Sequence, residues 1–129
     1  MNILFLCKGN SCRSQMAEGF AKRYLRGHNV FSAGFAPEGY VHPMSVRVMR
    51  ERGIDISNQR SKGLDALPPL RWDVVVLVCS AHECPTYEGA TVEVWDIPDP
   101  FGGDLKAYRR VRDLIEERVK LLARRLSTT

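Results

Sequence analysis

Two short apolar runs constrain the fold more than any other feature of this chain. Residues 2–7 (NILFLC) and 73–79 (DVVVLVC) are apolar almost without interruption, which is typical of strands buried on both faces of a sheet. Such strands are parallel and are joined by helical crossovers. The sequence therefore predicts an α/β fold in which helices cover a parallel sheet.

The remaining pattern alternates strands with helices. Further strands are predicted at residues 29–34 and 91–97. Helices are predicted where apolar residues recur every three or four positions, at 14–25, at 43–53 and from an N-cap at Asp104 to near the C-terminus. In an open sheet of this kind the ligand site lies beyond the carboxyl ends of the strands.

Size and composition favour one small globular unit. The 129 residues, 44% of them hydrophobic, suffice for a single domain spanning 1–129. The absence of a long apolar stretch or a basic leader predicts a cytoplasmic protein without membrane partners. The net charge of +4 favours anionic ligands but is too small to indicate nucleic-acid binding. Four cysteines in a cytoplasmic chain indicate catalysis, redox exchange or metal binding rather than structural disulfides.

The loop between the first strand and the first helix carries a C-x5-R-S pattern that runs from Cys7 to Ser14. Five intervening residues let successive backbone N–H groups turn inward, and the following helix adds its positive N-terminal end. Arg13 can grip two oxygens of a bound anion at once. The predicted oxyanion-binding loop consists of Lys8, Gly9, Asn10, Ser11, Cys12 and Arg13.

Cys7 is the candidate nucleophile of this loop. The cationic surroundings that bind an oxyanion also stabilise a thiolate. Ser14 is placed to donate its hydroxyl to that thiolate, and Asn10 to bridge backbone groups of the loop. A lone cysteine that ends a strand is more often a small buried apolar residue, but this loop context favours catalysis.

The pattern C-x-G-N-x-C-R-S-x-M-A-E, together with SAG at 32–34, GIDIS at 53–57 and the Asp99-Pro100 pair, resembles the low-molecular-weight protein tyrosine phosphatase superfamily, which includes arsenate reductases. The resemblance covers essentially the whole chain. It implies a three-layer α/β/α, phosphotyrosine phosphatase I-like fold with a four-stranded parallel sheet in the order 2-1-3-4. It also implies that Cys7 is the nucleophile, Arg13 the oxyanion clamp and Asp99 the general acid that protonates the leaving oxygen.

A second group of cysteines favours the reductase branch, which serves arsenical resistance. Cys79 ends a predicted strand and is expected on the same sheet edge as Cys7. Cys79 and Cys84 are similar to the redox cysteines of arsenate reductases, which implies a relay of disulfides from Cys7 to this pair. Thioredoxin or glutaredoxin/glutathione would then regenerate the enzyme. The interval between Cys79 and Cys84 is shorter than in thioredoxin-linked reductases, and the pair can also be read as a core residue and an incidental loop thiol.

Two other functions use the same loop. A low-molecular-weight phosphatase would hydrolyse phosphate monoesters through a phosphocysteine at Cys7, and a noncatalytic module would bind oxyanions or arsenite. A zinc site at Cys79, His82 and Cys84 has too few ligands and an unusual spacing, so no metal is predicted. No cofactor is predicted.

Some members of the arsenate reductase subfamily that this chain resembles bind a potassium ion beside the loop. The corresponding side chains here are Asn10, Glu18 and Ser32. Arg60 and Lys62 stand where further oxygen ligands would lie, so we expect a lysine ammonium in place of the ion.

Overall fold

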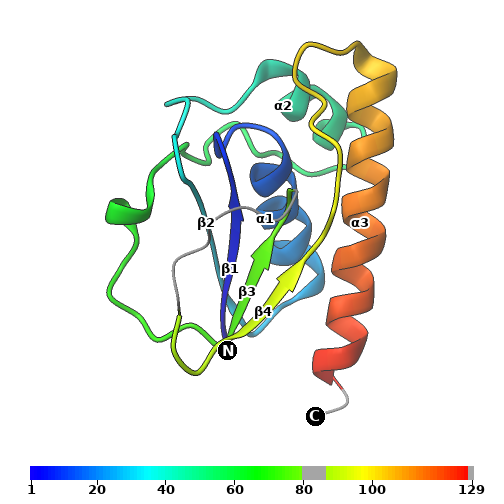
Figure 1. Ribbon diagram of the computed structural model, residues 1–129. Helices are drawn as coiled ribbons and strands as arrows, with labels where there is room; N and C mark the ends of the chain where they lie inside the picture. The colour runs from blue at the N-terminus through cyan, green and yellow to red at the C-terminus, as the bar shows by residue number, and fades with distance from the viewer. Residues whose placement is uncertain (80–86, 128–129) are drawn as a thin grey trace.

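The structure is a computed structural model that describes residues 1–79 and 87–127. Figure 1 shows a sheet with helices stacked along one side of it. The strands are β1 (Asn2–Cys7), β2 (Asn29–Gly34), β3 (Val74–Leu77) and β4 (Thr91–Val94), and the helices are α1 (Arg13–Tyr24), α2 (Pro43–Arg50), the 3-10 turn η1 (Leu64–Ala66) and α3 (Leu105–Ser127).

The four strands form one parallel sheet in the order β2-β1-β3-β4, which confirms the predicted topology. Cys7 is paired with Gly34, and Leu6 with Leu77. β3 and β4 are shorter than predicted and end at Leu77 and Val94, although Val78 N still donates to Leu6 O, and Trp95 N to Leu77 O. Val78 and Trp95 therefore lie at the same edge of the sheet as Cys7.

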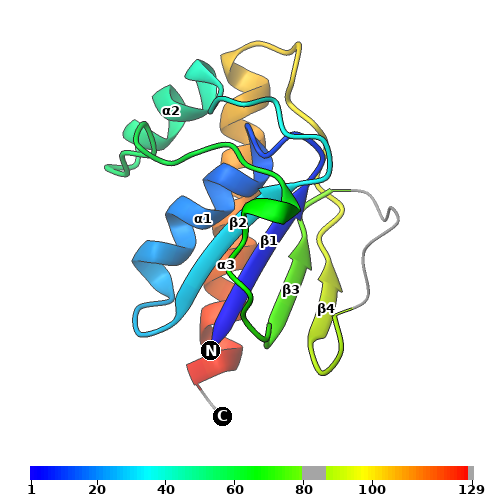
Figure 2. The same ribbon diagram turned by 90° about the vertical axis from the view of Figure 1, so that its left-hand side faces the viewer.

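Side chains alternate between the two faces of the sheet, and each face has its own core. On one face Ile3 and Phe5 pack against α1, α2 and α3, with α3 lying across both shorter helices. On the other face Leu4 and Leu6 pack against Trp72 and the η1 region. Figure 2 shows η1 in front of β1 and β2. In the described residues this second layer consists of the 3-10 turn η1 and connecting segments.

The helices begin where capping chemistry permits. Asp104 Oδ1 accepts a hydrogen bond from Ala107 N, as predicted for an N-cap. His42 caps α2, because its Nδ1 accepts a hydrogen bond from Met44 N and Pro43 occupies the first turn. The described part of the chain contains no helix that is both long and apolar enough to cross a membrane.

Candidate active site

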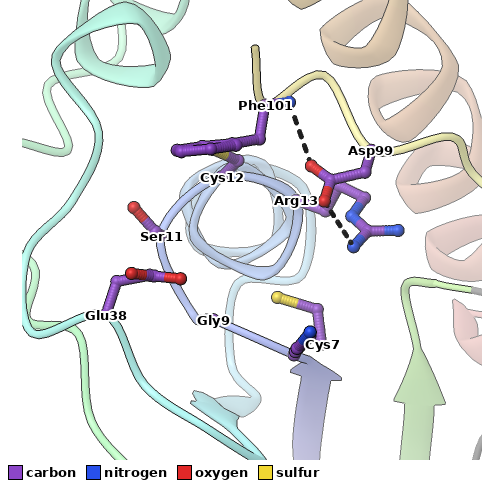
Figure 3. Close-up of a pocket in the computed structure, with 9 residues that line it drawn as sticks. Cys7, Gly9, Ser11, Cys12, Arg13, Glu38, Asp99 and Phe101 are labelled. Carbon is purple, nitrogen blue, oxygen red and sulfur yellow. Dashed lines mark hydrogen bonds and ion pairs between the residues drawn. The ribbon is translucent and has the colours of Figure 1, made fainter.

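The loop after β1 encloses a pocket of about 240 Å³ at the carboxyl edge of the sheet. Figure 3 shows the loop encircling the axis of α1, with the Cys7 sulfur pointing toward its centre. Residues from three separate segments line the pocket: Cys7, Lys8, Gly9, Ser11, Cys12, Arg13, Glu38, Asp99 and Phe101.

Cys7 is buried, and its Sγ lies 2.8 Å from Ser14 Oγ. Asn10 Nδ2 donates to the same hydroxyl oxygen at 2.8 Å. Because Asn10 supplies a proton to that oxygen, the hydroxyl keeps its own proton for the sulfur. Ser14 is therefore oriented to donate to a Cys7 thiolate, which accepts a charge-assisted hydrogen bond.

Asn10 fixes the shape of the loop. Its φ of 47° lies in the left-handed region, which asparagine tolerates better than most residues. Nδ2 donates to Ser14 Oγ and Ser32 Oγ, and Oδ1 accepts from Lys62 N and Gln15 Nε2. One buried side chain thereby ties the loop to β2, to α1 and to the segment around residue 62.

Two further supports were not identified from the sequence. Gln15 is fully buried; its Nε2 donates to Asn10 O and its Oε1 accepts from Gln59 Nε2. Gly34 lets the end of β2 lie against the loop, since a Cβ there would stand 2.6 Å from Lys8 O. Gln59 is 44 positions from its partner, so only the fold reveals this contact.

Arg13 and Asp99 meet at the mouth of the pocket. Arg13 Nη1 donates to Ile97 O at 3.0 Å, and Nη2 lies 3.6 Å from Asp99 Oδ2. Asp99 Oδ1 accepts from Phe101 N, so the carboxylate also stabilises a turn. The Arg13 side chain is 10% exposed and that of Asp99 is 56% exposed. A buried cation thus stands beside an accessible carboxylate, as an oxyanion clamp and a proton donor require.

Cys12 occupies the back of the loop. Its Sγ lies 3.6 Å from the Tyr108 hydroxyl. Burial is the main cause that raises the pKa of the Cys12 thiol, and burial likewise raises the pKa of Tyr108. Both groups therefore keep their protons at neutral pH.

Cys79 is buried two positions beyond the end of β3 and borders a second hollow of about 250 Å³. This hollow is lined by Lys8, Arg13, Cys79, Asp96, Ile97, Pro98 and Asp99. It shares Lys8, Arg13 and Asp99 with the pocket around Cys7. The topology therefore brings Cys7 and Cys79 to neighbouring hollows, whereas His82 and Cys84 lie outside the described residues.

Glu18 and Lys62 lie behind the loop. Glu18 Oε1 accepts a hydrogen bond from Ser32 Oγ, and Lys62 Nζ lies 3.8 Å from the same oxygen and donates to Arg60 O. Burial lowers the pKa of Lys62, while Glu18 opposes that shift. The lysine ammonium thus stands beside Glu18, one of the side chains that correspond to potassium ligands in the subfamily.

The fold and this site together define a class of proteins: parallel α/β enzymes that present a cysteine at the end of the first strand inside an oxyanion cradle closed by arginine. The model of the low molecular weight phosphotyrosine protein phosphatase family matches residues 2–129, and the chain belongs to that family.

Similar proteins include several reductases. An arsenate reductase of Brevibacillus brevis is 46% identical over 125 residues, which cover 94% of this chain and 92% of the relative. A solved structure of an arsenate reductase in the phosphate binding state has a TM-score of 0.86 and 39% identity, covering 96% of this chain and 97% of that one. An arsenate reductase of Archaeoglobus fulgidus has a TM-score of 0.83 and 34% identity, covering 94% and 98%.

Proposed function

We propose that this protein is a cytoplasmic arsenate reductase that works by a cysteine relay. The observation that carries the proposal is the position of Cys79, which borders a hollow that shares Lys8, Arg13 and Asp99 with the Cys7 pocket. Hydrolysis of a phosphate monoester needs no second thiol there. The 46% identity to an arsenate reductase supports the same conclusion.

The first step forms a bond between Cys7 and arsenic. Loop amides and Arg13 hold the arsenate oxygens, and the Cys7 thiolate attacks the arsenic(V) centre. One oxygen leaves as water after Asp99 donates a proton to it. The product is a covalent Cys7 arsenate adduct, still bound in the cradle.

The second step is the reduction. The Cys79 thiolate attacks the Cys7 sulfur, and the electron pair of the sulfur–arsenic bond passes to arsenic. Arsenic(V) becomes arsenic(III) and leaves as arsenite, while the two sulfurs are oxidised to a Cys7–Cys79 disulfide. Electrons balance, because two leave the thiols and two reach arsenic.

The third step regenerates the nucleophile. The Cys84 thiolate attacks the Cys79 sulfur and releases Cys7, leaving a Cys79–Cys84 disulfide. A cytoplasmic dithiol of the thioredoxin type, or glutaredoxin with glutathione, reduces this disulfide. The relay therefore separates the anion site from the site that meets the reductant.

Substitution of each sulfur tests this proposal. Multiple-turnover arsenate reduction with thioredoxin, and separately with glutaredoxin and glutathione, falls to background in both Cys7→Ser and Cys79→Ser, because each lacks one partner of the first disulfide. Hydrolysis of p-nitrophenyl phosphate, which needs Cys7 in its cradle but no second thiol, is lost in Cys7→Ser and is unaffected in Cys79→Ser. Arsenate turnover that survives Cys79→Ser refutes the relay, and efficient monoester hydrolysis without arsenate turnover identifies a phosphatase.

A further inference from the structure

The segment after β2 holds Glu38 beside the oxyanion loop. Three backbone bonds join the two segments: Phe35 N donates to Cys7 O, Ala36 N to Lys8 O, and Glu38 N to Gly9 O at 2.9 Å. Ser61 Oγ clamps the next position, since it accepts from Gly39 N and donates to Gly9 O. The backbone of Glu38 is therefore fixed relative to the loop.

The absence of a side chain at Gly9 leaves room for the Glu38 side chain. A Cβ at position 9 would stand 2.9 Å from Glu38 Cγ and 3.4 Å from Glu38 Oε1, so the acidic side chain packs on bare loop backbone. Its carboxylate lines the same pocket as Cys7 and Arg13. In Figure 3 Glu38 and Asp99 lie on opposite sides of the loop, with the Cys7 sulfur between them.

The two carboxylates differ in whether a positively charged side chain is paired with them. Asp99 is paired with Arg13 at 3.6 Å. Within residues 1–79 and 87–127, the Glu38 carboxylate has neither an ion-pair nor a hydrogen-bond partner, although Lys8 lines the same pocket. The wall on the Glu38 side is thus negative, while the floor of the pocket binds anions.

We propose that Glu38 is a specificity-determining residue that makes the mouth of the pocket prefer phosphoryl or phosphonyl groups attached to a cationic organic substituent. The tetrahedral head of such a ligand sits in the cradle, and its substituent leaves past the Glu38 wall. A positive charge there is attracted by the carboxylate, and a negative charge is repelled. The same wall weakens binding of a free dianion. The inference rests on the oxyanion cradle of the proposed function but not on the relay.

Three phosphonates of matched size test the preference: benzylphosphonate and its 4-aminomethyl and 4-carboxy derivatives. Their dissociation constants for the full-length protein are measured calorimetrically at low salt. The cationic probe binds on the order of tenfold more tightly than the anionic one, and this ratio shrinks as salt is added. In Glu38→Gln the ratio falls to about one, and inorganic phosphate binds a few-fold more tightly.

The control is Glu117→Gln, which removes an exposed carboxylate of α3 outside the pocket and leaves the ratio unchanged. A ratio near one in the unmodified protein, or a ratio that Glu38→Gln does not change, overturns the inference while leaving arsenate reduction intact. A charge preference in a protein that does not reduce arsenate supports the inference and refutes the proposed function. Failure to bind any phosphonate or phosphate refutes both.

Discussion

The oxyanion loop and the charged surface between α2 and α3 both rely on polar contacts, yet they differ in burial. In the loop Asn10 and Ser14 are fully buried, and each bonds to protein groups. On the surface Glu51 bonds to Arg109 and Arg112, but its side chain is 34% exposed. A lost contact in the loop leaves a buried polar atom unpaired, whereas water replaces much of a lost surface contact. Burial therefore makes the loop rigid and costly to alter.

The largest effect is expected at the clamp. Arg13→Lys keeps the charge but loses the planar fork that contacts Ile97 O and faces Asp99. We expect kcat/KM for arsenate to fall about 100-fold or more, as when one oxyanion donor is removed from other active sites. Steady-state kinetics measure the loss, and Arg110→Lys on the exposed side of α3 is the control. Equal activity of the two variants would contradict the role of Arg13.

The next effect concerns the stability of the loop. Asn10→Gly keeps the left-handed backbone but removes the hydrogen bonds that Asn10 donates to Ser14 and Ser32 and takes its acceptor away from the Lys62 amide. The free energy of unfolding therefore falls by about 2 to 3 kcal/mol. Asn10→Ala adds a strained backbone and costs about 1 to 2 kcal/mol more. Urea denaturation monitored by circular dichroism gives both values. If Asn10→Ala lowers the free energy of unfolding no more than Asn10→Gly does, the left-handed backbone at position 10 does not affect stability.

The smallest effect is expected on the surface. Hydrogen bonding from Arg109 is the main cause that lowers the pKa of Glu51 from its ordinary 4.5 to about 2. The carboxylate therefore stabilises the fold above pH 4.5, and this contribution is lost as the pH falls toward 2. Thermal melts of Glu51→Gln should show a slightly lower Tm than the unmodified protein at pH 7, with the gap closing at acid pH. If the difference in Tm between the two proteins is the same at every pH, the charge of Glu51 is not the cause of that difference.

Local sequence signals were sufficient to predict those elements whose structure depends on residues adjacent in the chain. The continuous apolar runs predict β1 and β3, and Asp104 predicts the start of α3. The strand ends were less predictable: β3 ends at Leu77 and β4 at Val94, whereas the predicted strands continue to Cys79 and Ile97. Over Leu4 and Leu6 the described residues contribute the short turn η1.

Long-range contacts mark the limit of prediction within the site. The C-x5-R-S spacing indicates that Cys7 and Arg13 face one anion and that Ser14 donates to the Cys7 sulfur, and the structure brings the three residues together. The support of Gln15 by Gln59 depends on side chains 44 positions apart. The carboxylate of Glu38 gave no sequence signal either, because its position depends on the backbone ladder between residues 35–38 and the loop.

Disulfide mapping after a single turnover tests the relay most directly. Cys84→Ser is mixed with one equivalent of arsenate, its remaining thiols are alkylated, and its peptides are identified by mass spectrometry. The relay predicts one Cys7–Cys79 disulfide for each arsenite released. Release of arsenite with Cys79 still alkylatable, or with Cys7 joined to Cys12, would contradict it.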